Sequence, residues 1–325
     1  MIEINSKKID MWSKIGSRAT LGLAILEIEK NLDNLCVVTC DVSTSAGLDR
    51  FRKQRPDKYL DLGISEQNMI GISSGLASEG FKVITTTFAP FQTLRCCEQI
   101  KVNLGYMKNK IVMVGLASGL VLGTLGFTHC SIEEVGVLRS IPNITIISPA
   151  DTLEVVKALI ASINHKESVY IRLTGAAPMK SLYKEDYKFE IGKAVKLQDG
   201  KDVAIFSTGA SVYHSLEAAK LLQENGISCS VINFHTIKPI DEKMIIEEIS
   251  KKKLIVTVEE HNIIGGLGSA VSETVSKLPN TPQKISMGIE DSYGGGGTYN
   301  FLLNKYGLNA EGIVKRISTE IELIK

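Results

Sequence analysis

Long apolar segments are absent from the sequence. No run of about 18 apolar residues, the length that spans a bilayer, occurs in the 325 residues. The N-terminal segment MIEINSKKIDMW has no apolar core of signal-peptide length. Charge of one sign is also lacking, because 37 basic residues nearly balance 36 acidic ones. We therefore expect a cytoplasmic protein with no nucleic-acid or membrane partner, in which local side chains neutralise any charged substrate.

Paired cysteine motifs are missing as well. The six cysteines include no CxxC pair, and most of them fall in apolar runs with the pattern of strands or helices. This pattern predicts buried, reduced thiols. The chain has no internal repeat, and its one low-complexity tract is the glycine run at 294–297. What remains is the composition of an ordinary globular protein, 44% apolar and 22% charged.

The sequence predicts an α/β protein with two domains. A length of 325 residues fits two domains, because domains usually contain roughly 100 to 200 residues. Short β-branched runs alternate with amphipathic stretches, which is typical of mostly parallel sheets flanked by helices. Helices are expected around residues 21–28, from Ser211 to Asn225, and after Asp151, where Glu154 completes a capping-box spacing. Strands are expected at 35–41, 82–88, 110–116, 143–148, 202–208, 228–234 and 253–259.

A change of composition marks the expected domain boundary. Hydrophobic periodicity lapses in residues 176–192, where Gly, Pro and mixed charges follow one another. We therefore expect one domain at 1–175, a linker at 176–192 and a second domain at 193–325.

The segment DLGISEQNMIGISSGLASEG at 61–80 places a carboxylate at the start of a helix that follows a strand. Ligands of open α/β sheets collect at the carboxyl ends of the strands, so Glu66 is expected to face that crevice. A glutamate that only interacts with the helix dipole is the structural alternative.

Two further motifs carry candidate site residues. In TTTFAPFQTLR at 85–95, Phe88 and Phe91 could form an apolar wall against a flat ring. In GLVLGTLGFTHCSIEEVGVLRSIPNI at 119–144, His129 closes a long glycine-rich loop of the kind that is commonly functional. Taken singly, each motif also fits an ordinary structural role.

Taken together and in this order, the three motifs resemble the pyrimidine-binding domain of transketolases. The resemblance continues through IISPAD, VYIRLTG, VTVEEHNIIGGLGSAVSE and GIEDSYGGGG, and it spans nearly the whole chain. It implies the C-terminal half of a thiamine-diphosphate-dependent transketolase, with a pyrimidine-binding domain followed by the transketolase C-terminal domain. The implied reaction transfers a two-carbon ketol unit from a ketose, expected to be phosphorylated, to an aldose.

The resemblance also assigns catalytic and cofactor-binding residues. In the family, the glutamate matching Glu66 hydrogen-bonds the aminopyrimidine ring and promotes the imino form that removes the thiazolium C2 proton. Phe88 and Phe91 match the aromatic residues that hold this ring. Asp41 matches a residue that lines the cofactor channel. His129 matches a histidine that contacts substrate hydroxyls and moves protons.

A phosphate grip is implied in the same way. Arg18, Ser45 and Arg172 align with positions that hold the phosphate of a sugar, a role that suits the planar fork of arginine. Surface or interdomain salt bridging is the alternative role for the arginines. Two departures from the family are expected to alter which sugars are accepted: Leu125 replaces an acidic residue four positions before His129, and Ala117 lies near the place of a further histidine.

The GDG motif of the family's diphosphate-binding domain is absent from the sequence. In the family this motif, with a later Asn, holds the Mg²⁺ that anchors the two phosphates, and Mg²⁺ prefers octahedral oxygen ligands that include substrate phosphates. We therefore expect no metal ligand on this chain. A separate N-terminal, diphosphate-binding subunit is expected to supply the ligands, within an α2β2 heterotetramer.

Other interpretations remain open. Deoxyxylulose-phosphate synthase and the β subunits of 2-oxo acid dehydrogenases share the domain order and the glutamate. A non-catalytic regulatory or scaffolding subunit is the alternative of another class, although the joint presence of the four motif residues argues against it. The glycines at 265–271 favour a helix start over a dinucleotide site, because Val271 stands where the fingerprint requires Gly or Ala. The tract at 294–297 fits either an anion cradle or a turn.

Overall fold

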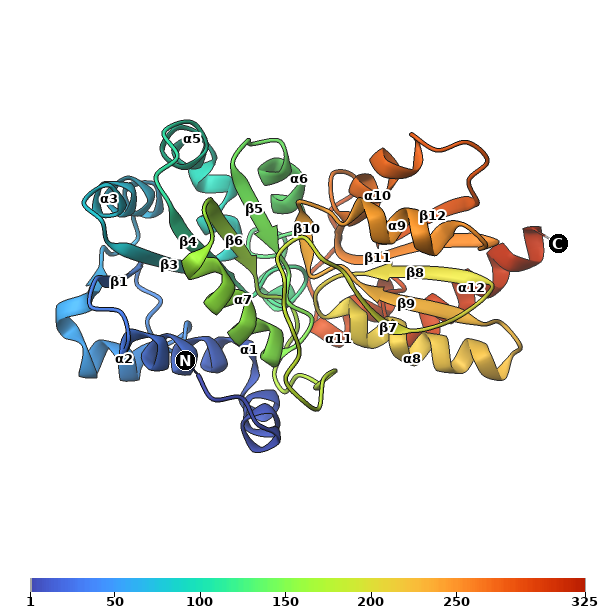
Figure 1. Cartoon of the computed structure of the whole chain (residues 1–325), viewed down its shortest axis with the longest axis horizontal. Coiled ribbons are helices and arrows are strands. Elements are labelled where there is room, and N and C mark those ends of the chain that lie inside the picture. Colours follow the sequence, from blue (N-terminus) through green and yellow to red (C-terminus); the bar gives the residue numbers. More distant parts are fainter. Residues whose placement is uncertain (1, 325) are drawn as a thin grey trace.

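The computed structural model describes residues 2–324, which form two α/β units side by side (Figure 1). The N-terminal unit, blue to green in Figure 1, has a seven-stranded sheet. The C-terminal unit, yellow to red, has a five-stranded sheet. Each sheet has a hydrophobic core on both faces, because helices cover both. The predicted α/β class is confirmed.

The first sheet is parallel except for one edge strand. Its strand order is β10-β5-β6-β4-β3-β1-β2, and β10 pairs with β5 in the antiparallel sense. The predicted strands of this half are confirmed to within two residues. The bounds are β1 (Leu35–Thr39), β2 (Tyr59–Asp61), β3 (Lys82–Phe88), β4 (Ile111–Leu116), β5 (Ile144–Ile147), β6 (Ser168–Arg172) and β10 (Thr236–Lys238).

Helices pack on both faces of this sheet. On one face α1 packs against α7, and on the other α3 and the π-helical turn η3 cover the strands. The N-terminal helix is longer than predicted and is kinked at Gly16, where φ is 79°. The bounds are α1 (Ser6–Glu29), α2 (Asp49–Gln54), η1 (Pro56–Lys58), α3 (Glu66–Ser78), α4 (Ala89–Gln92), η2 (Leu94–Cys96), α5 (Cys97–Gln99), η3 (Ile100–Tyr106), η4 (Gly123–Leu125), α6 (Glu134–Arg139) and α7 (Thr152–Asn164).

The start of α7 follows from its sequence. The Asp151 side chain accepts a hydrogen bond from the amide of Glu154 at 2.9 Å, as the capping spacing predicts. The Glu154 carboxylate reaches back to the amide of Ala150, one residue before the cap, at 2.7 Å. Two of the donors at this helix end are therefore paired.

The second sheet has the order β12-β11-β8-β9-β7 and is parallel except for β7. The strands predicted in this half and the helix from Ser211 are confirmed. The strands are β7 (Val195–Gln198), β8 (Val203–Ser207), β9 (Cys229–Asn233), β11 (Leu254–Asn262) and β12 (Gln283–Ile289). The helices are α8 (Ser211–Glu224), α9 (Glu242–Ile249), α10 (Leu267–Val275), α11 (Tyr299–Lys305) and α12 (Ala310–Ile324).

The stretch between β6 and β7, residues 173–194, contains no helix or strand and contacts both units. Tyr183 and Tyr187 stack at 4.3 Å, and both hydroxyls donate to the Glu154 carboxylate of α7. Asn233, at the end of β9, donates to the same carboxylate at 2.7 Å. One buried carboxylate therefore joins α7, the connecting stretch and the second sheet.

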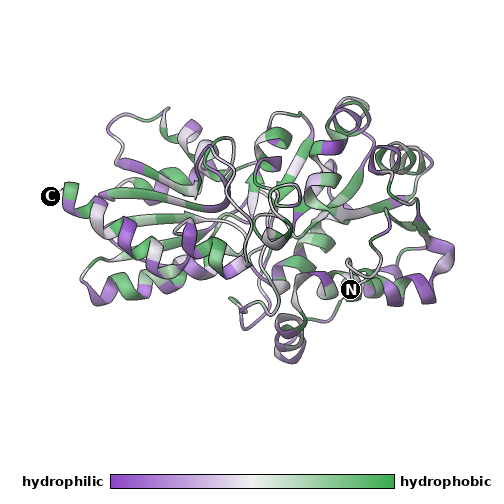
Figure 2. Ribbon diagram, turned by 180° about the vertical axis from the view of Figure 1, so that it is seen from behind, coloured by the Kyte–Doolittle hydropathy of each residue, from purple (hydrophilic) through white to green (hydrophobic). Residues whose placement is uncertain are grey.

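Hydropathy follows this architecture (Figure 2). Apolar residues concentrate on the strands and on the inner sides of the helices, while polar residues lie on the outer sides of the helices. Among residues 2–324, no helix combines the length and the apolar character that a membrane span requires.

Candidate active site

The predicted site residues gather at one edge of the first sheet. Strands β1, β2, β3, β4 and β6 are parallel, so their carboxyl ends lie along the same edge, where ligands of such sheets bind. A predicted residue lies at the end of each of these strands or in the segment that follows it. In chain order these are Asp41 and Ser45 after β1, Glu66 after β2, Phe88 and Phe91 at β3, His129 in the long loop after β4, and Arg172 at the end of β6.

Glu66 is the first residue of α3, and its side chain is 4% exposed. Its Oε2 accepts a hydrogen bond from Arg95 Nη1 at 2.8 Å. Its Oε1 accepts no hydrogen bond from any residue within 2–324. The Arg95 side chain is 41% exposed, so the ion pair lies at the surface of the isolated chain. Arg95 was not singled out from the sequence, although it stands in the same motif as the two phenylalanines.

Aromatic side chains continue the site from this ion pair. The Arg95 guanidinium lies 4.0 Å from the centre of the Phe91 ring. The Phe88 and Phe91 rings meet edge to face, with centroids 6.4 Å apart. The imidazole of His129 lies 5.3 Å from the Phe91 ring. The structure therefore brings together Glu66, both phenylalanines and His129.

These residues fit an aminopyrimidine ring. Such a ring needs an acceptor for one ring nitrogen and an apolar surface for its face. Glu66 offers a carboxylate oxygen that is free of donors from the described part of the chain, and the half-buried Phe91 offers the ring surface beside it. The acceptor and the apolar ring surface therefore fit an aminopyrimidine ring.

Asp41 lies two residues after the end of β1 and adopts a positive φ of 57°. Its amide donates to Asp61 Oδ1 at 2.9 Å, while its own side chain is exposed. Burial opposes ionisation of Asp61, but the amides of Asp41 and Gly63 outweigh it and hold the pKa of Asp61 below its usual value. Asp61, which was not singled out from the sequence, therefore fixes the turn that presents Asp41.

Arg18 and Ser45 line one pocket of about 570 Å³, together with Ala117. The Arg18 side chain is exposed and has no carboxylate partner within residues 2–324. Ala117 adopts a φ of 52° in the wall of this pocket, and Leu125 is 56% exposed near His129. The pocket thus combines the Arg18 cation with an apolar group at Ala117, whereas Leu125 does not line it.

Arg172 does not reach this pocket. It is 1% exposed, and its Nε donates to the Glu134 carboxylate at 2.5 Å. Its Nη2 donates to the carbonyl oxygens of Ser131 at 3.1 Å and Glu260 at 2.7 Å. Because Glu260 belongs to β11, these contacts favour the alternative role of an arginine that bridges the two units.

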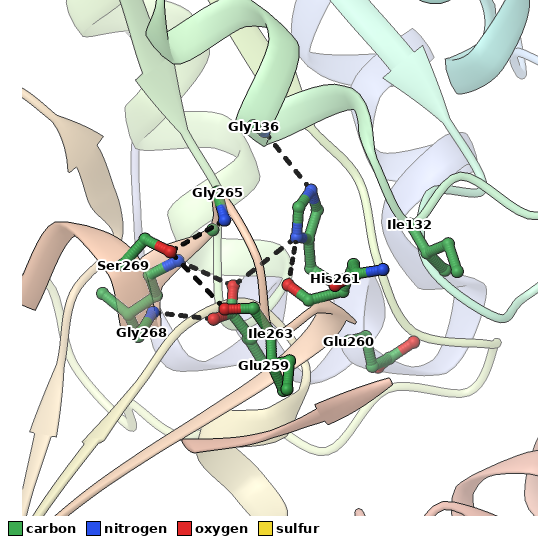
Figure 3. A network of polar contacts seen from close by, with 12 residues as sticks. Ile132, Gly136, Glu259, Glu260, His261, Ile263, Gly265, Gly268 and Ser269 are labelled. Carbon is green, nitrogen blue, oxygen red and sulfur yellow. Dashed lines mark hydrogen bonds and ion pairs between the residues drawn. The ribbon is translucent and has the colours of Figure 1, made fainter. Parts of the chain in front are cut away.

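The predicted helix start at 265–271 is confirmed by α10. Glu259 accepts from the amides of Leu267 and Gly268, both at 2.7 Å, and so pairs two free donors at the N-terminus of the helix (Figure 3). Within residues 2–324, no cluster of His, Cys, Asp or Glu side chains is suited to hold a metal ion.

Comparisons with known proteins identify the family of the chain. Residues 13–178 match the family described as "Transketolase, pyrimidine binding domain", and residues 192–313 match "Transketolase, C-terminal domain". The chain is 36% identical over 309 residues to the "Putative transketolase C-terminal section" of Methanocaldococcus jannaschii, which covers 94% of this chain and 96% of that protein. The chain therefore belongs to the transketolase family.

More specific relatives are subunits of transketolases. An apulose-4-phosphate transketolase subunit of Phocaeicola vulgatus is 36% identical, with 96% of this chain and 98% of that protein covered. "6-deoxy-6-sulfo-D-fructose transketolase subunit SqwH" of a Clostridium species is 35% identical, with 90% of each covered. Among solved structures, "Split gene transketolase, inactive beta4 tetramer" superposes with a TM-score of 0.84 at 30% identity and covers 95% of this chain and 99% of that one. The chain is thus a transketolase subunit with the pyrimidine-binding and C-terminal domains.

Proposed function

We propose that this chain is the C-terminal subunit of a split transketolase that transfers a two-carbon ketol unit from a ketose to an aldose. The observation that carries the proposal is the convergence of the Glu66 carboxylate, the Phe91 ring and the His129 imidazole at one sheet edge. We assign residues 1–175 to the pyrimidine-binding domain and 193–325 to the C-terminal domain, joined by 176–192. All six cysteines are free, which supports action in the reducing cytoplasm.

Each site residue has a defined task in this proposal. When bound, thiamine diphosphate supplies the nucleophilic carbon that attacks the ketose. Glu66 accepts a hydrogen bond from the pyrimidine ring, Phe88 and Phe91 exclude water from its face, and Asp41 lines the cofactor channel. His129, whose ring contacts Phe91, contacts substrate hydroxyls and transfers protons.

A partner subunit completes the proposed enzyme. We propose that it carries the Mg²⁺ ligands and the diphosphate site, and that two copies of each chain form an α2β2 heterotetramer. The Phocaeicola relative is named as one subunit of its transketolase, which supports a second chain. The solved split transketolase described as an inactive β4 tetramer supports the need for that chain in catalysis.

We propose a substrate with an anionic terminal group. Arg18 is a cation without a carboxylate partner in the described part of the chain, it lies in a pocket that Ser45 shares, and a guanidinium can hold two oxygens of one phosphate or sulfonate. Two relatives are named for a sugar phosphate and for a sulfo sugar, which supports an anion at this position. Arg172 is left out of this grip, because its guanidinium is bound to Glu134.

The test is ketol transfer by this chain mixed with a diphosphate-binding subunit, thiamine diphosphate and Mg²⁺. Activity is expected only in the mixture. Glu66→Ala should lower the rate by at least about 100-fold without loss of assembly, because the ring loses its carboxylate partner. Glu79→Ala, an exposed change at the other end of α3, is the matched control and should leave the rate unchanged. Full activity from this chain alone would contradict the proposal.

Deoxyxylulose-phosphate synthase activity is the second candidate. The synthase of Caldanaerobacter subterraneus is 32% identical over 91% of this chain, but this match covers 47% of that protein. A synthase would consume pyruvate and release CO2, which a transketolase does not. Product analysis with pyruvate as the donor therefore separates the two activities.

A further inference from the structure

The loop that carries His129, residues 119–131, belongs to the first unit in sequence but packs in the second. Leu120 at its start is fully buried in the hydrophobic core around β8 and β11. Ile132, which follows the loop, is 1% exposed in the same core. Phe127 packs against this core from the middle of the loop. The C-terminal unit therefore provides the surface on which the histidine loop lies.

Glu260 of β11 holds the base of the loop. Its Oε2 accepts from the amide of Leu120 at 3.3 Å, and its Oε1 accepts from the hydroxyl of Tyr299 at 2.5 Å. Burial raises the pKa of this carboxyl. A Cβ atom on Gly119, where φ is 70°, would lie 2.7 Å from Oε2, so this close approach requires glycine. Two residues further along β11, the amide of Asn262 donates to the carbonyl of Ile132 at 2.7 Å.

Figure 3 shows Glu260 and Ile132 on one side of His261. Glu259 lies in the same strand but points to the N-terminus of α10, where it pairs with two amides. The two neighbouring carboxylates of β11 thus bind different segments. Glu259 accepts from amides of α10 in its own unit, and Glu260 accepts from an amide of the histidine loop of the other unit.

The glycine tract at 294–297 holds the middle of the loop. The amide of Gly297 donates to the carbonyl of Gly123 at 2.9 Å. A Cβ atom on Gly123 would overlap the Leu302 side chain, and one on Gly296 would lie 2.8 Å from the carbonyl oxygen of Gly123. Any side chain at these glycines would separate the two backbones. The close packing of residues 294–297 against the loop therefore explains why glycines occur in this tract.

An aromatic pair holds the part of the loop nearest the histidine. The rings of Phe127 and Tyr293 lie 5.5 Å apart, and Tyr293 is otherwise 71% exposed. His129 follows Phe127 by two residues and places its imidazole against Phe91. The contacts at the base, middle and tip thus come from two segments of the C-terminal unit, which are β11 at the base and residues 293–297 at the middle and the tip.

We propose that the C-terminal domain positions His129 for the reaction, with Glu260 and Tyr293 as positioning residues. The catalytic role of His129 in this inference rests on the proposed function. The claim that the C-terminal domain keeps residues 119–131 ordered does not depend on it. Neither side chain touches the reacting atoms. They act by holding the loop so that the imidazole stays beside the ring of Phe91, because small displacements of catalytic groups lower rates steeply.

The first test is hydrogen–deuterium exchange of the chain alone, read by mass spectrometry over residues 119–131. Glu260→Leu removes both acceptors and should speed exchange in the loop by about 10-fold or more, since the Leu120 amide loses its partner. Glu260→Gln keeps an acceptor for Leu120 and a donor for Tyr299, so it should behave like the unmodified chain. Glu259→Leu is the matched control and should speed exchange in α10 instead of the loop.

Tyr293→Ser keeps the test valid if Glu260→Leu does not fold, because Tyr293 is mostly exposed. It should also speed exchange of the loop. In the assembled enzyme, Tyr293→Ser should lower kcat/KM by about 10-fold while the Kd of thiamine diphosphate stays within about 2-fold, because the cofactor residues are untouched. Leu323→Ser, an exposed change in α12, is the control for this variant.

Unchanged loop exchange in both Glu260→Leu and Tyr293→Ser would overturn the inference. Faster exchange with unchanged kcat/KM would overturn it too, since the contacts would then not serve the histidine. Lack of ketol transfer by the unmodified complex would instead overturn the proposed function, and the exchange measurement on the isolated chain would remain decisive for the order of the loop.

Discussion

The Glu66 carboxylate has one oxygen bound and one free of partners in the described part of the chain. Arg95 donates to Oε2 at 2.8 Å, and its guanidinium lies 4.0 Å from the centre of the Phe91 ring. Glu66 and Phe91 therefore both hold the guanidinium in place. A buried carboxylate without a cation would be costly, because burial disfavours the charged form. Arg95 therefore offsets this cost, and in the proposed function Oε1 accepts from the pyrimidine ring.

Removal of this cation should weaken the enzyme. A charge-assisted hydrogen bond is worth about 1.5 to 3 kcal/mol, so Arg95→Gln should lower kcat/KM by roughly 10-fold to 100-fold in the assembled complex. Arg95→Lys should restore part of the loss, because it returns the charge without the fork. Titration of activity with thiamine diphosphate measures both effects. Equal rates for Arg95→Gln and the unmodified enzyme would show that the ion pair is dispensable.

The order of the motifs was enough to predict which residues gather at the sheet edge. Glu66, the phenylalanines and His129 each follow a strand end, and parallel strands bring such ends together. The carboxylate partners of the arginines could not be predicted from the sequence, because they are far away along the chain. Glu134 lies 38 residues before Arg172, and Glu66 lies 29 residues before Arg95. The same residue type can hold a ligand phosphate or a buried carboxylate, and only the fold distinguishes them.

At the scale of elements, two buried carboxyls lie at the start of α7, which are Asp151 at the N-cap and Glu154 in the first turn. Burial and the charge of Glu154 raise the pKa of Asp151 from 3.8 to about 7, and burial raises the pKa of Glu154 itself. A carboxyl whose pKa is higher in the folded than in the unfolded state makes folding less favourable once it must ionise. The stabilisation that comes from the protonated carboxyl is fully present below the unfolded pKa and is lost as pH rises through the folded pKa.

The free energy of unfolding should therefore fall as pH rises from about 4 to about 7. Glu154→Gln should make this fall smaller, because it removes one titrating group and the charge that raises the pKa of Asp151. Gln can still accept from the Ala150 amide and donate to Tyr183 or Tyr187. Urea unfolding at pH 5 and pH 8 measures the difference. Identical pH dependence in the two proteins would contradict the assignment.

Regular elements were predictable where the pattern was long enough to read. The β-branched runs and the cap of α7 predicted strands and a helix to within a few residues. Several elements were not predicted, among them the strands β6, β7, β10 and β12, and neither was the kink of α1. The strand β10 has three residues, too few for a period, and its pairing with β5 depends on residues far away in sequence. The kink of α1 depends on Gly16, which a hydrophobic pattern alone does not reveal.

At the scale of the whole molecule, the cofactor edge is open in the isolated chain. Ile64, two residues before Glu66, is 76% exposed at this edge. In the proposed assembly the diphosphate-binding subunit covers it, since thiamine diphosphate must contact both chains. Exposed apolar side chains near a site are typical of surfaces that a partner buries.

Ile64→Lys should therefore weaken association with the partner subunit by about 10-fold or more, because a charge would be buried at the contact. Leu323→Lys has the same 76% exposure in α12 and should leave association unchanged. Analytical ultracentrifugation of the mixed chains measures both variants. Equal association of Ile64→Lys and the unmodified chain would place the partner elsewhere.

The strand β10 has a consequence for synthesis of the protein. It covers the β5 edge of the first sheet, yet it comes after β7, β8, α8 and β9 of the second unit in the chain. A ribosome must release the chain through Lys238 before the first sheet has its final strand. Until then the β5 edge offers unpaired backbone groups, the arrangement that invites strands from other molecules. A nascent or truncated chain that stops before β10 therefore depends on protection against aggregation. All the predicted site residues precede β10 in the chain and have already been made at that stage.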